Sequence, residues 1–134
     1  MHKTPESTKE LTLVGVYGSL LAGLGNHRVL HGAEFVGPDS LPPEYGMVSL
    51  GGFPGVFKDG DSPIVLELYL VDADGLIRLD RLEGNGSFYT REEVRTDGNA
   101  LPWVYLLPKA GYKDNETVAS GDWKAFYKGY RYDY

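Results

Sequence analysis

Glu83 is the residue of this 134-residue chain best suited to acid–base chemistry. It stands in the run Leu79-Asp80-Arg81-Leu82-Glu83-Gly84, one helical turn beyond Leu79 and therefore beside the apolar face of a predicted helix. A carboxylate there is partly desolvated, and the C-terminal end of a helix is unfavourable for an anion. Both effects raise the pKa of the carboxyl group, as a general base that works near neutral pH requires. The alternative interpretation is a solvent-facing glutamate near a frayed helix end.

A glycine-rich loop is the second feature that could take part in ligand binding or catalysis. Residues 17–26, Tyr-Gly-Ser-Leu-Leu-Ala-Gly-Leu-Gly-Asn, follow an apolar run that is typical of a strand. Glycines leave backbone N–H groups free to point at a ligand, so such a loop can hold a carboxylate or a developing oxyanion. No Gly-Lys-Ser/Thr follows, and the glycine spacing differs from the dinucleotide fingerprint, which disfavours nucleotide binding. The alternative interpretation is a strand-exit turn in which Asn26 caps a short helix.

Other reactive side chains form weaker patterns. Glu67 lies within the apolar run 64–71, where it is a candidate second acid, a ligand-positioning group or an edge-strand carboxylate paired with an arginine. His27 and His31 are too few for a zinc triad, so no metal site is expected. Ser19 has no evident His and Asp partners for a hydrolase triad. Because the chain has no cysteine, disulfides, thiolate zinc sites and thiol nucleophiles are excluded.

Short strands and one clear helix must position these groups. Strands are expected at 11–17, 33–37, 45–50 and 64–71, with a break at Asp39-Ser-Leu-Pro-Pro43 between the second and third. Residues 72–83 have leucines three apart, aspartates near their start and Gly84 after their end, which predicts a helix. The runs 88–95 and 101–107 predict a hairpin around Asp97-Gly98. Since crossover helices are few, we expect a mostly antiparallel barrel or strongly curled sheet with a helix attached.

The composition fits one small domain. The chain has 19 acidic and 13 basic residues, and its net charge of -6 is the wrong sign for an electrostatic nucleic-acid binder. The longest nearly apolar run is far shorter than the roughly 20 residues that span a bilayer, and the first ten residues lack a signal-peptide core. We therefore expect no membrane partner and a cytoplasmic location. We expect a flexible arm at 1–10, one domain at 11–127 and an aromatic tail at 128–134, and the choice between monomer and homodimer stays open.

Several motifs follow one another in a specific order along residues 11–127. Tyr17-Gly18-Ser19-Leu20 is followed by Gly23 and Asn26, and Leu79-Asp80-x-x-Glu83-Gly84 comes later. The other motifs are Gly52-Phe53-Pro54-Gly55-Val56, Glu67-Leu68-Tyr69, Tyr89-x-Arg91, Val104-Tyr105 and Ser120-Gly121-Asp122-Trp123. In this combination the chain resembles the gamma-glutamyl cyclotransferase-like family, which includes gamma-glutamylamine cyclotransferases and avirulence-induced-gene-like domains.

The resemblance implies an α+β fold, a small mixed and mostly antiparallel β-barrel with a few flanking helices. It also implies an enzyme that needs no cofactor and releases 5-oxoproline and a free amine from a gamma-glutamyl amine or gamma-glutamyl amino acid. Glu83 would be its general acid/base. The substrate-binding residues would be Tyr17, Gly18, Ser19, Leu20, Asn26 and Tyr105. Some relatives that cut gamma-glutamyl amines carry Lys where this chain has Leu21, so the substrate preference does not follow from the resemblance.

Two other functions stay open on the sequence alone. The first is a non-catalytic module that uses the same pocket to recognise a small molecule or peptide, because a fold does not by itself establish catalysis. The second is an interaction protein whose acidic surface binds a basic partner. Production of 5-oxoproline separates the enzyme from both, and capture that depends strongly on salt would support the second.

Overall fold

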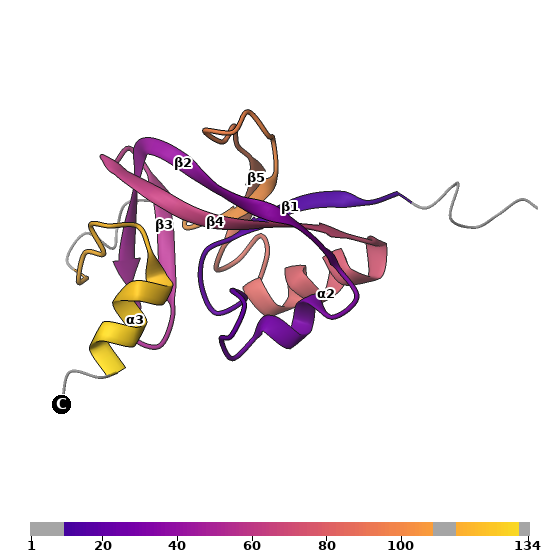
Figure 1. The fold of residues 1–134 in the computed structure, drawn as a ribbon, viewed down its shortest axis with the longest axis horizontal. Helices are drawn as coiled ribbons and strands as arrows, with labels where there is room; N and C mark the ends of the chain where they lie inside the picture. The colour runs from indigo at the N-terminus through magenta and orange to yellow at the C-terminus, as the bar shows by residue number, and fades with distance from the viewer. Residues whose placement is uncertain (1–9, 109–114, 132–134) are drawn as a thin grey trace, which may run out of the picture.

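The computed structural model describes residues 10–108 and 115–131 (Figure 1). The elements in chain order are β1 (Thr12–Val16), the 3-10 helix η1 (His27–Leu30), β2 (Glu34–Ser49), β3 (Pro54–Lys58), β4 (Ser62–Val71), α2 (Ala73–Glu83), β5 (Thr90–Glu93), β6 (Trp103–Leu106) and α3 (Trp123–Arg131). Residues 1–9 of the expected arm and 132–134 of the expected tail lie outside the described residues.

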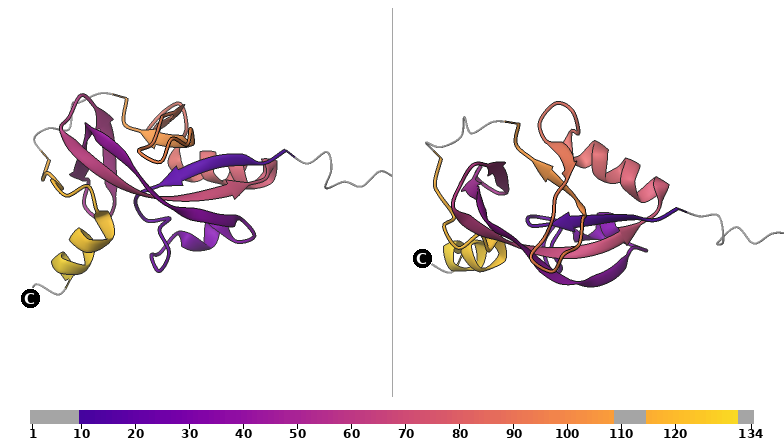
Figure 2. Two further views of the ribbon diagram at one scale, coloured as in Figure 1. Left: turned by 45° about the horizontal axis from the view of Figure 1, so that its top comes forward. Right: turned by 90° about the horizontal axis from the view of Figure 1, so that it is seen from above.

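The strands form one curled, mixed sheet in the order β3-β2-β4-β1-β6-β5. Neighbouring strands are antiparallel except for β1 and β6, which pair in parallel at Val14 and Trp103. The curl brings the end of β6 back to β3, where the Leu107 N–H donates to the Val56 carbonyl at 2.8 Å. Figures 1 and 2 show α2 and α3 near opposite ends of this sheet. The expected fold class is confirmed as a mixed half-barrel with two α-helices.

β4 runs through the middle of the sheet and supplies much of the core. Ile64, Leu66 and Leu68 point to one side and are buried, while Val65 between them is exposed. This alternation is the period of two expected for a strand with one face on the core. Leu79 of α2 is fully buried as well. The helix that carries Glu83 is therefore fixed to the core by its apolar side.

β2 differs from the expectation of two strands separated by a break. It runs unbroken from Glu34 to Ser49, and its register against β4 shifts between Leu41 and Tyr45. Pro42 and Pro43 lie inside this shift, where they need not donate a ladder hydrogen bond. The prolines therefore mark the place where the strand changes its main partner from β4 to β3, not the place where it ends.

α2 begins and ends where its sequence signals predict. The Asp72 carboxylate accepts the Gly75 N–H at 2.8 Å as the N-cap, and Gly84 has the left-handed conformation that ends the helix. Glu83 is the last residue of the helix, so this stop determines where its side chain points.

α3 has no counterpart among the predicted helices. Trp123 is 2% exposed, and its ring stacks on Phe126 and Tyr127 at centroid distances of 5.3 and 5.6 Å. Gly121 has a φ of 66°, and a β-carbon there would collide with the Pro63 carbonyl. The chain is thus held against β4 just before α3, which then continues past the predicted domain boundary at residue 127.

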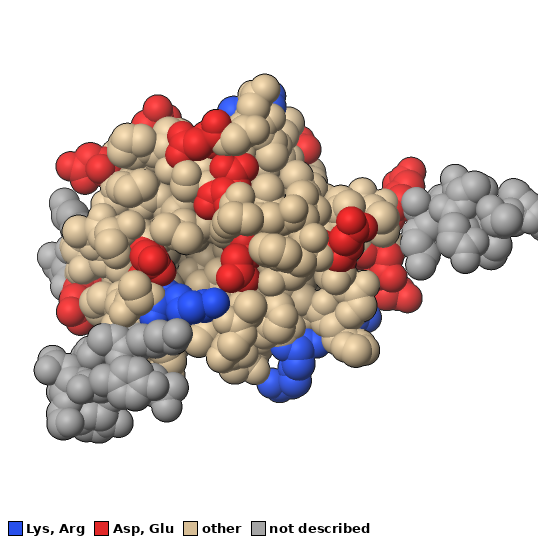
Figure 3. Space-filling model, viewed as in Figure 1, with Lys and Arg blue, Asp and Glu red and all other residues tan. Residues whose placement is uncertain are grey.

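The acidic excess of the chain is visible on its surface. Figure 3 shows Asp and Glu side chains spread from one end of the face in view to the other, whereas Lys and Arg lie in a few separate places. Among the helices of the described residues, none is both long and apolar enough to cross a membrane.

Candidate active site

A cavity of about 360 Å³ lies between the loop after β1, the turn before β3 and the C-terminal end of α2. All seven residues predicted for the site line it: Tyr17, Gly18, Ser19, Leu20, Asn26, Glu83 and Tyr105. The turn and helix end add side chains that the sequence interpretation did not assign to the site, namely Phe53, Pro54, Leu82, Phe88 and Tyr89. The fold thus brings the predicted residues together, while their chemical roles stay predictions.

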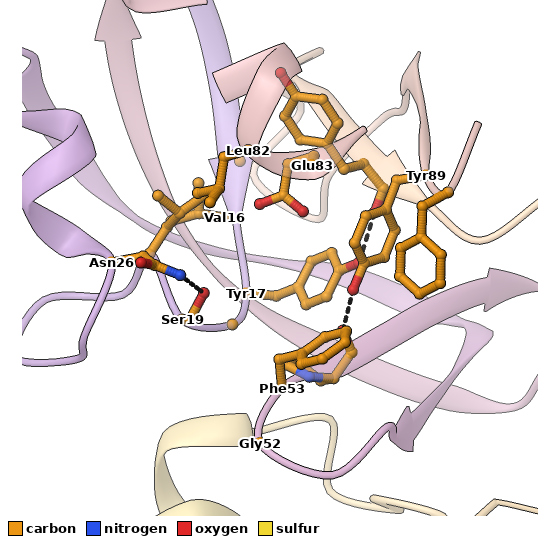
Figure 4. Close-up of a pocket in the computed structure, with 15 residues that line it drawn as sticks. Val16, Tyr17, Ser19, Asn26, Gly52, Phe53, Leu82, Glu83 and Tyr89 are labelled. Carbon is orange, nitrogen blue, oxygen red and sulfur yellow. Dashed lines mark hydrogen bonds between the residues drawn. The ribbon is translucent and has the colours of Figure 1, made fainter. Parts of the chain in front are cut away.

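Glu83 points from the end of α2 into the cavity (Figure 4). Its side chain is half-buried, and among the described residues no donor or cation pairs with its carboxylate. Because burial disfavours the charged form, the pKa of Glu83 rises from 4.5 to about 7. The group can therefore exchange a proton near neutral pH.

The loop after β1 presents backbone donors to the same cavity. The N–H groups of Gly18, Ser19 and Leu20 have no acceptor among the described residues. The loop is closed by other bonds: the Leu21 N–H donates to the Gly18 carbonyl, and the Asn26 N–H to the Ser19 carbonyl, both at 2.9 Å. Three neighbouring N–H groups form a site suited to a carboxylate or an oxyanion.

Asn26 and Gly18 have specific parts in this loop. Asn26 occupies the N-cap position of η1, as the alternative interpretation expected, but its side chain makes no cap bond there and its amide donates instead to the Ser19 hydroxyl at 2.9 Å. A β-carbon on Gly18 would lie 2.8 Å from Cδ of Pro54, so a glycine is needed for this close approach. The loop is packed against the turn before β3 at this point.

Another wall of the cavity is formed by three tyrosines, Tyr17, Tyr89 and Tyr105. The Tyr17 hydroxyl donates to the Tyr105 carbonyl at 2.5 Å, and the Tyr89 hydroxyl to the Pro54 carbonyl at 2.6 Å (Figure 4). Burial, with smaller contributions from Tyr89 and Glu83, raises the pKa of Tyr17 well above 10. Burial also raises the pKa of Tyr105. Tyr17 and Tyr105 therefore stay neutral near pH 7 and line the wall as uncharged groups.

Asp80 supports this wall from behind, a role that the sequence interpretation missed. Its carboxylate accepts the Tyr105 hydroxyl at 2.6 Å and two bonds from the Arg91 guanidinium at 2.8 and 3.2 Å. Burial opposes its ionisation, but the bonds from Arg91 and Tyr105 lower its pKa below the usual value. Arg91 also lies over the Trp103 ring, 4.8 Å from its centre. The available signal was the spacing of Asp80 three residues before Glu83.

Glu67 does not enter this cavity. Its Oε1 accepts the Ala22 N–H at 2.9 Å and the Tyr69 hydroxyl at 3.0 Å, and its Oε2 lies 3.5 Å from Nζ of Lys124. It faces a second groove, on the other side of the loop. The interpretation as an edge-strand carboxylate paired with an arginine is wrong in two respects, because β4 lies between β2 and β1 and the cation is Lys124.

The remaining candidates do not form a reactive group. His27 makes a 2.8 Å hydrogen bond through Nδ1 to the Leu20 carbonyl, and Ser19 is bonded to Asn26. Within residues 10–108 and 115–131, no cluster of three or more His, Asp or Glu side chains is placed to hold a metal ion.

The chain is similar to known proteins over most of its length. Residues 14–125 match the family model described as gamma-glutamyl cyclotransferase, AIG2-like. The chain is 36% identical over 109 residues to the gamma-glutamylcyclotransferase family protein YtfP of Escherichia coli K12, which covers 81% of this chain and 92% of that protein. The chain belongs to the gamma-glutamyl cyclotransferase, AIG2-like family.

Solved structures share the fold. An uncharacterized protein from Pyrococcus horikoshii matches with a TM-score of 0.75 and 24% identity, over 92% of this chain and 99% of that one. An AIG2-like protein from mouse matches with a TM-score of 0.74 and 23% identity, over 84% and 89%. At these identities the likeness concerns the fold alone.

Proposed function

We propose that the protein is a gamma-glutamyl cyclotransferase that releases 5-oxoproline and a free amine from a gamma-glutamyl amine or gamma-glutamyl amino acid. The observation that carries the proposal is a cavity in which neither the Glu83 carboxylate nor three neighbouring backbone N–H groups have a partner among the described residues. Family membership supports the same class of reaction.

The reaction needs no nucleophile from the protein. The substrate's own α-amino nitrogen attacks its γ-carbonyl carbon, which forms the ring C–N bond, and the bond from that carbon to the leaving nitrogen then breaks. Because attack and carbonyl belong to one molecule, holding the substrate in a folded conformation supplies much of the acceleration. A bound substrate therefore has to be oriented more than it has to be activated.

Glu83 moves the proton in this scheme. Its carboxylate takes a proton from the α-amino group as the ring closes and delivers it to the leaving nitrogen, so protons balance over the cycle. A pKa of about 7 suits both steps, since the group is easily deprotonated and still acidic enough to return the proton.

The loop after β1 binds the anionic parts of the substrate. The N–H groups of Gly18, Ser19 and Leu20 hold either the α-carboxylate or the oxyanion that develops on the γ-carbonyl. Tyr17 and Tyr105, joined by their hydrogen bond, form the wall that keeps the substrate folded. Asn26 holds the loop closed through Ser19.

The test is mass-spectrometric detection of 5-oxoproline from a panel of gamma-glutamyl amino acids, gamma-glutamyl amines and glutathione, with wild type and Glu83→Gln side by side. We expect release by wild type and its loss in the variant, whose fold is checked by circular dichroism. Binding without release from any substrate would contradict the enzyme and favour a recognition module that uses the same pocket.

A further inference from the structure

Three exposed apolar side chains stand around the cavity. Phe53, Leu82 and Phe88 line it and are 40%, 41% and 39% exposed. We name these three residues the apolar rim. Exposed apolar groups that gather at a concave site mark a place where a ligand covers them. We therefore expect an apolar group of a ligand to pack against the apolar rim.

The aromatic part of the rim is held in place before any ligand binds. The rings of Phe53 and Phe88 meet edge to face at 6.1 Å, and Phe88 meets Tyr89 in the same manner at 4.8 Å. Tyr89 is itself bonded to the Pro54 carbonyl. A rim that is already ordered loses little conformational entropy when it packs against a ligand.

The charges around the cavity favour an uncharged group at the apolar rim. Among the described residues that line it, Glu83 is the one charged side chain. Arg91, behind the wall, is bound to Asp80 and stacked on Trp103. A carboxylate on the leaving group would be placed against apolar rings, near an acidic group and without a cation, which costs desolvation energy.

Glu83 separates the two parts of the cavity. Figure 4 shows its carboxyl group with Ser19, Asn26 and Leu82 on one side and Tyr89 on the other, and with Phe53 below Tyr17. A gamma-glutamyl group held by the loop beside Ser19 can extend its leaving nitrogen past Glu83 toward Tyr89 and the aromatic part of the rim, Phe53 and Phe88. We propose that the rim selects gamma-glutamyl amides whose leaving amine carries an uncharged, aromatic or bulky apolar group. This inference rests on the proposed function.

Three synthetic substrates test the proposal: gamma-glutamyl methylamide, gamma-glutamyl benzylamide and gamma-glutamyl 4-carboxybenzylamide. The last two differ by one carboxylate. We expect wild-type kcat/KM for the benzylamide to exceed that for the methylamide by about 10- to 100-fold, as burial of one aromatic ring predicts. The carboxylate should remove most of this gain. Equal values for the three, or a preference for the carboxylate, would overturn the proposal.

Variants connect the preference to the rim. Phe53→Ala and Phe88→Ala should each reduce the ratio of benzylamide to methylamide kcat/KM by about 10-fold. Phe53→Leu, which keeps apolar bulk, should retain part of it. Phe35→Ala is the matched control, because Phe35 is 55% exposed and lines the second groove. An unchanged ratio in folded Phe53→Ala and Phe88→Ala would contradict the role of the rim.

A binding measurement separates this proposal from the proposed function. Calorimetric titration of Glu83→Gln with the same three amides reports the preference without turnover. If no amide yields 5-oxoproline, the proposed function fails, and tighter binding of the benzylamide would still support the rim. If turnover occurs and binding shows no preference for the benzylamide, the rim proposal fails alone.

Discussion

The two sides of the loop after β1 each hold one glutamate, and the two glutamates differ in how they are satisfied. On the cavity side, the Glu83 carboxylate makes no hydrogen bond or ion pair with a described residue. On the groove side, Glu67 is bonded to a backbone N–H of the loop, to Tyr69 and to Lys124. Both carboxylates are half-buried.

This difference separates a group that can act from one that holds structure. A carboxylate whose oxygens accept hydrogen bonds from several donors is held in place by them and serves the structure around it. A desolvated carboxylate without donors is unstable in its charged form and is ready to accept a proton. Glu67 accordingly holds the loop after β1 from the groove side. Glu83 lies on the cavity side of the same loop.

The largest expected effect is on the rate of 5-oxoproline formation. Glu83→Gln should lower kcat/KM by about 10²- to 10⁴-fold, the usual contribution of a positioned general base. Glu67→Gln should lower it by less than about 10-fold, because it leaves the proton-transferring group in place. Steady-state assays on both purified variants check this. A loss in Glu67→Gln as large as that in Glu83→Gln would break the distinction.

The pH profile sharpens the same contrast. Since Glu83 must be ionised to accept a proton and its pKa is about 7, wild-type kcat/KM should rise with pH and level off above about 7. Between pH 5 and 7 the rise should be about 50-fold, and it should approach 100-fold on the plateau above pH 7. Glu67→Gln should show the same rise of kcat/KM with pH. Its kcat/KM should be measured over the same pH range. A limb centred near pH 4.5 in wild type would contradict the assignment to a desolvated Glu83.

Glu83 should also make the fold less stable at alkaline pH. Its pKa is about 7 in the folded chain and about 4.5 when exposed, so stability is fully retained below 4.5 and falls as pH rises to 7. Glu83→Gln lacks this loss and should be more stable than wild type by roughly 2 kcal/mol at pH 8, after allowance for partial exposure. Urea unfolding at pH 8 and pH 4 measures it, and the advantage should vanish at the lower pH.

The opposite sign is expected for Glu67. Glu67→Ala removes two hydrogen bonds and the contact with Lys124, so it should reduce the free energy of unfolding by about 1–2 kcal/mol. Thermal and urea unfolding at neutral pH provide the value. A variant as stable as wild type would show that the loop does not depend on this carboxylate.

The smallest effect concerns the cation of that pair. Lys124 lies 3.5 Å from Glu67, and its side chain is 30% exposed. Lys124→Met should therefore cost at most about 1 kcal/mol, with the difference shrinking in high salt. Unfolding curves at low and high ionic strength check this, and a cost that salt does not change would point to packing of the lysine stem instead.

Local signals in the sequence were sufficient for the position of Glu83. The leucine spacing identifies the buried side of the helix, and Gly84 identifies its end, so the last helical residue follows from local rules. The glycines likewise predicted an open loop at Gly18. Such features depend on a few neighbouring residues, which a sequence displays directly.

The features that the sequence did not predict depend on distant partners. β2 continues across Pro42 and Pro43 because its register shifts against β4, and the partner strand cannot be inferred from the prolines. α3 is docked through Gly121 against Pro63, far away in the chain. The support of Tyr105 by Asp80 likewise joins residues 25 positions apart. Local propensity carries no information on such contacts.

The hydrogen bond from the Tyr17 hydroxyl to the Tyr105 carbonyl has a consequence for how the chain folds during its synthesis. Its two residues are 88 positions apart, and β1 pairs with β6 across a similar span. During synthesis, the loop that follows β1 therefore emerges well before the wall at Tyr105 does. Closing so long a loop is slow in entropic terms. The wall at Tyr105 is thus completed late, and a nascent chain that stops before Trp103 has Glu83 but lacks this wall of the cavity.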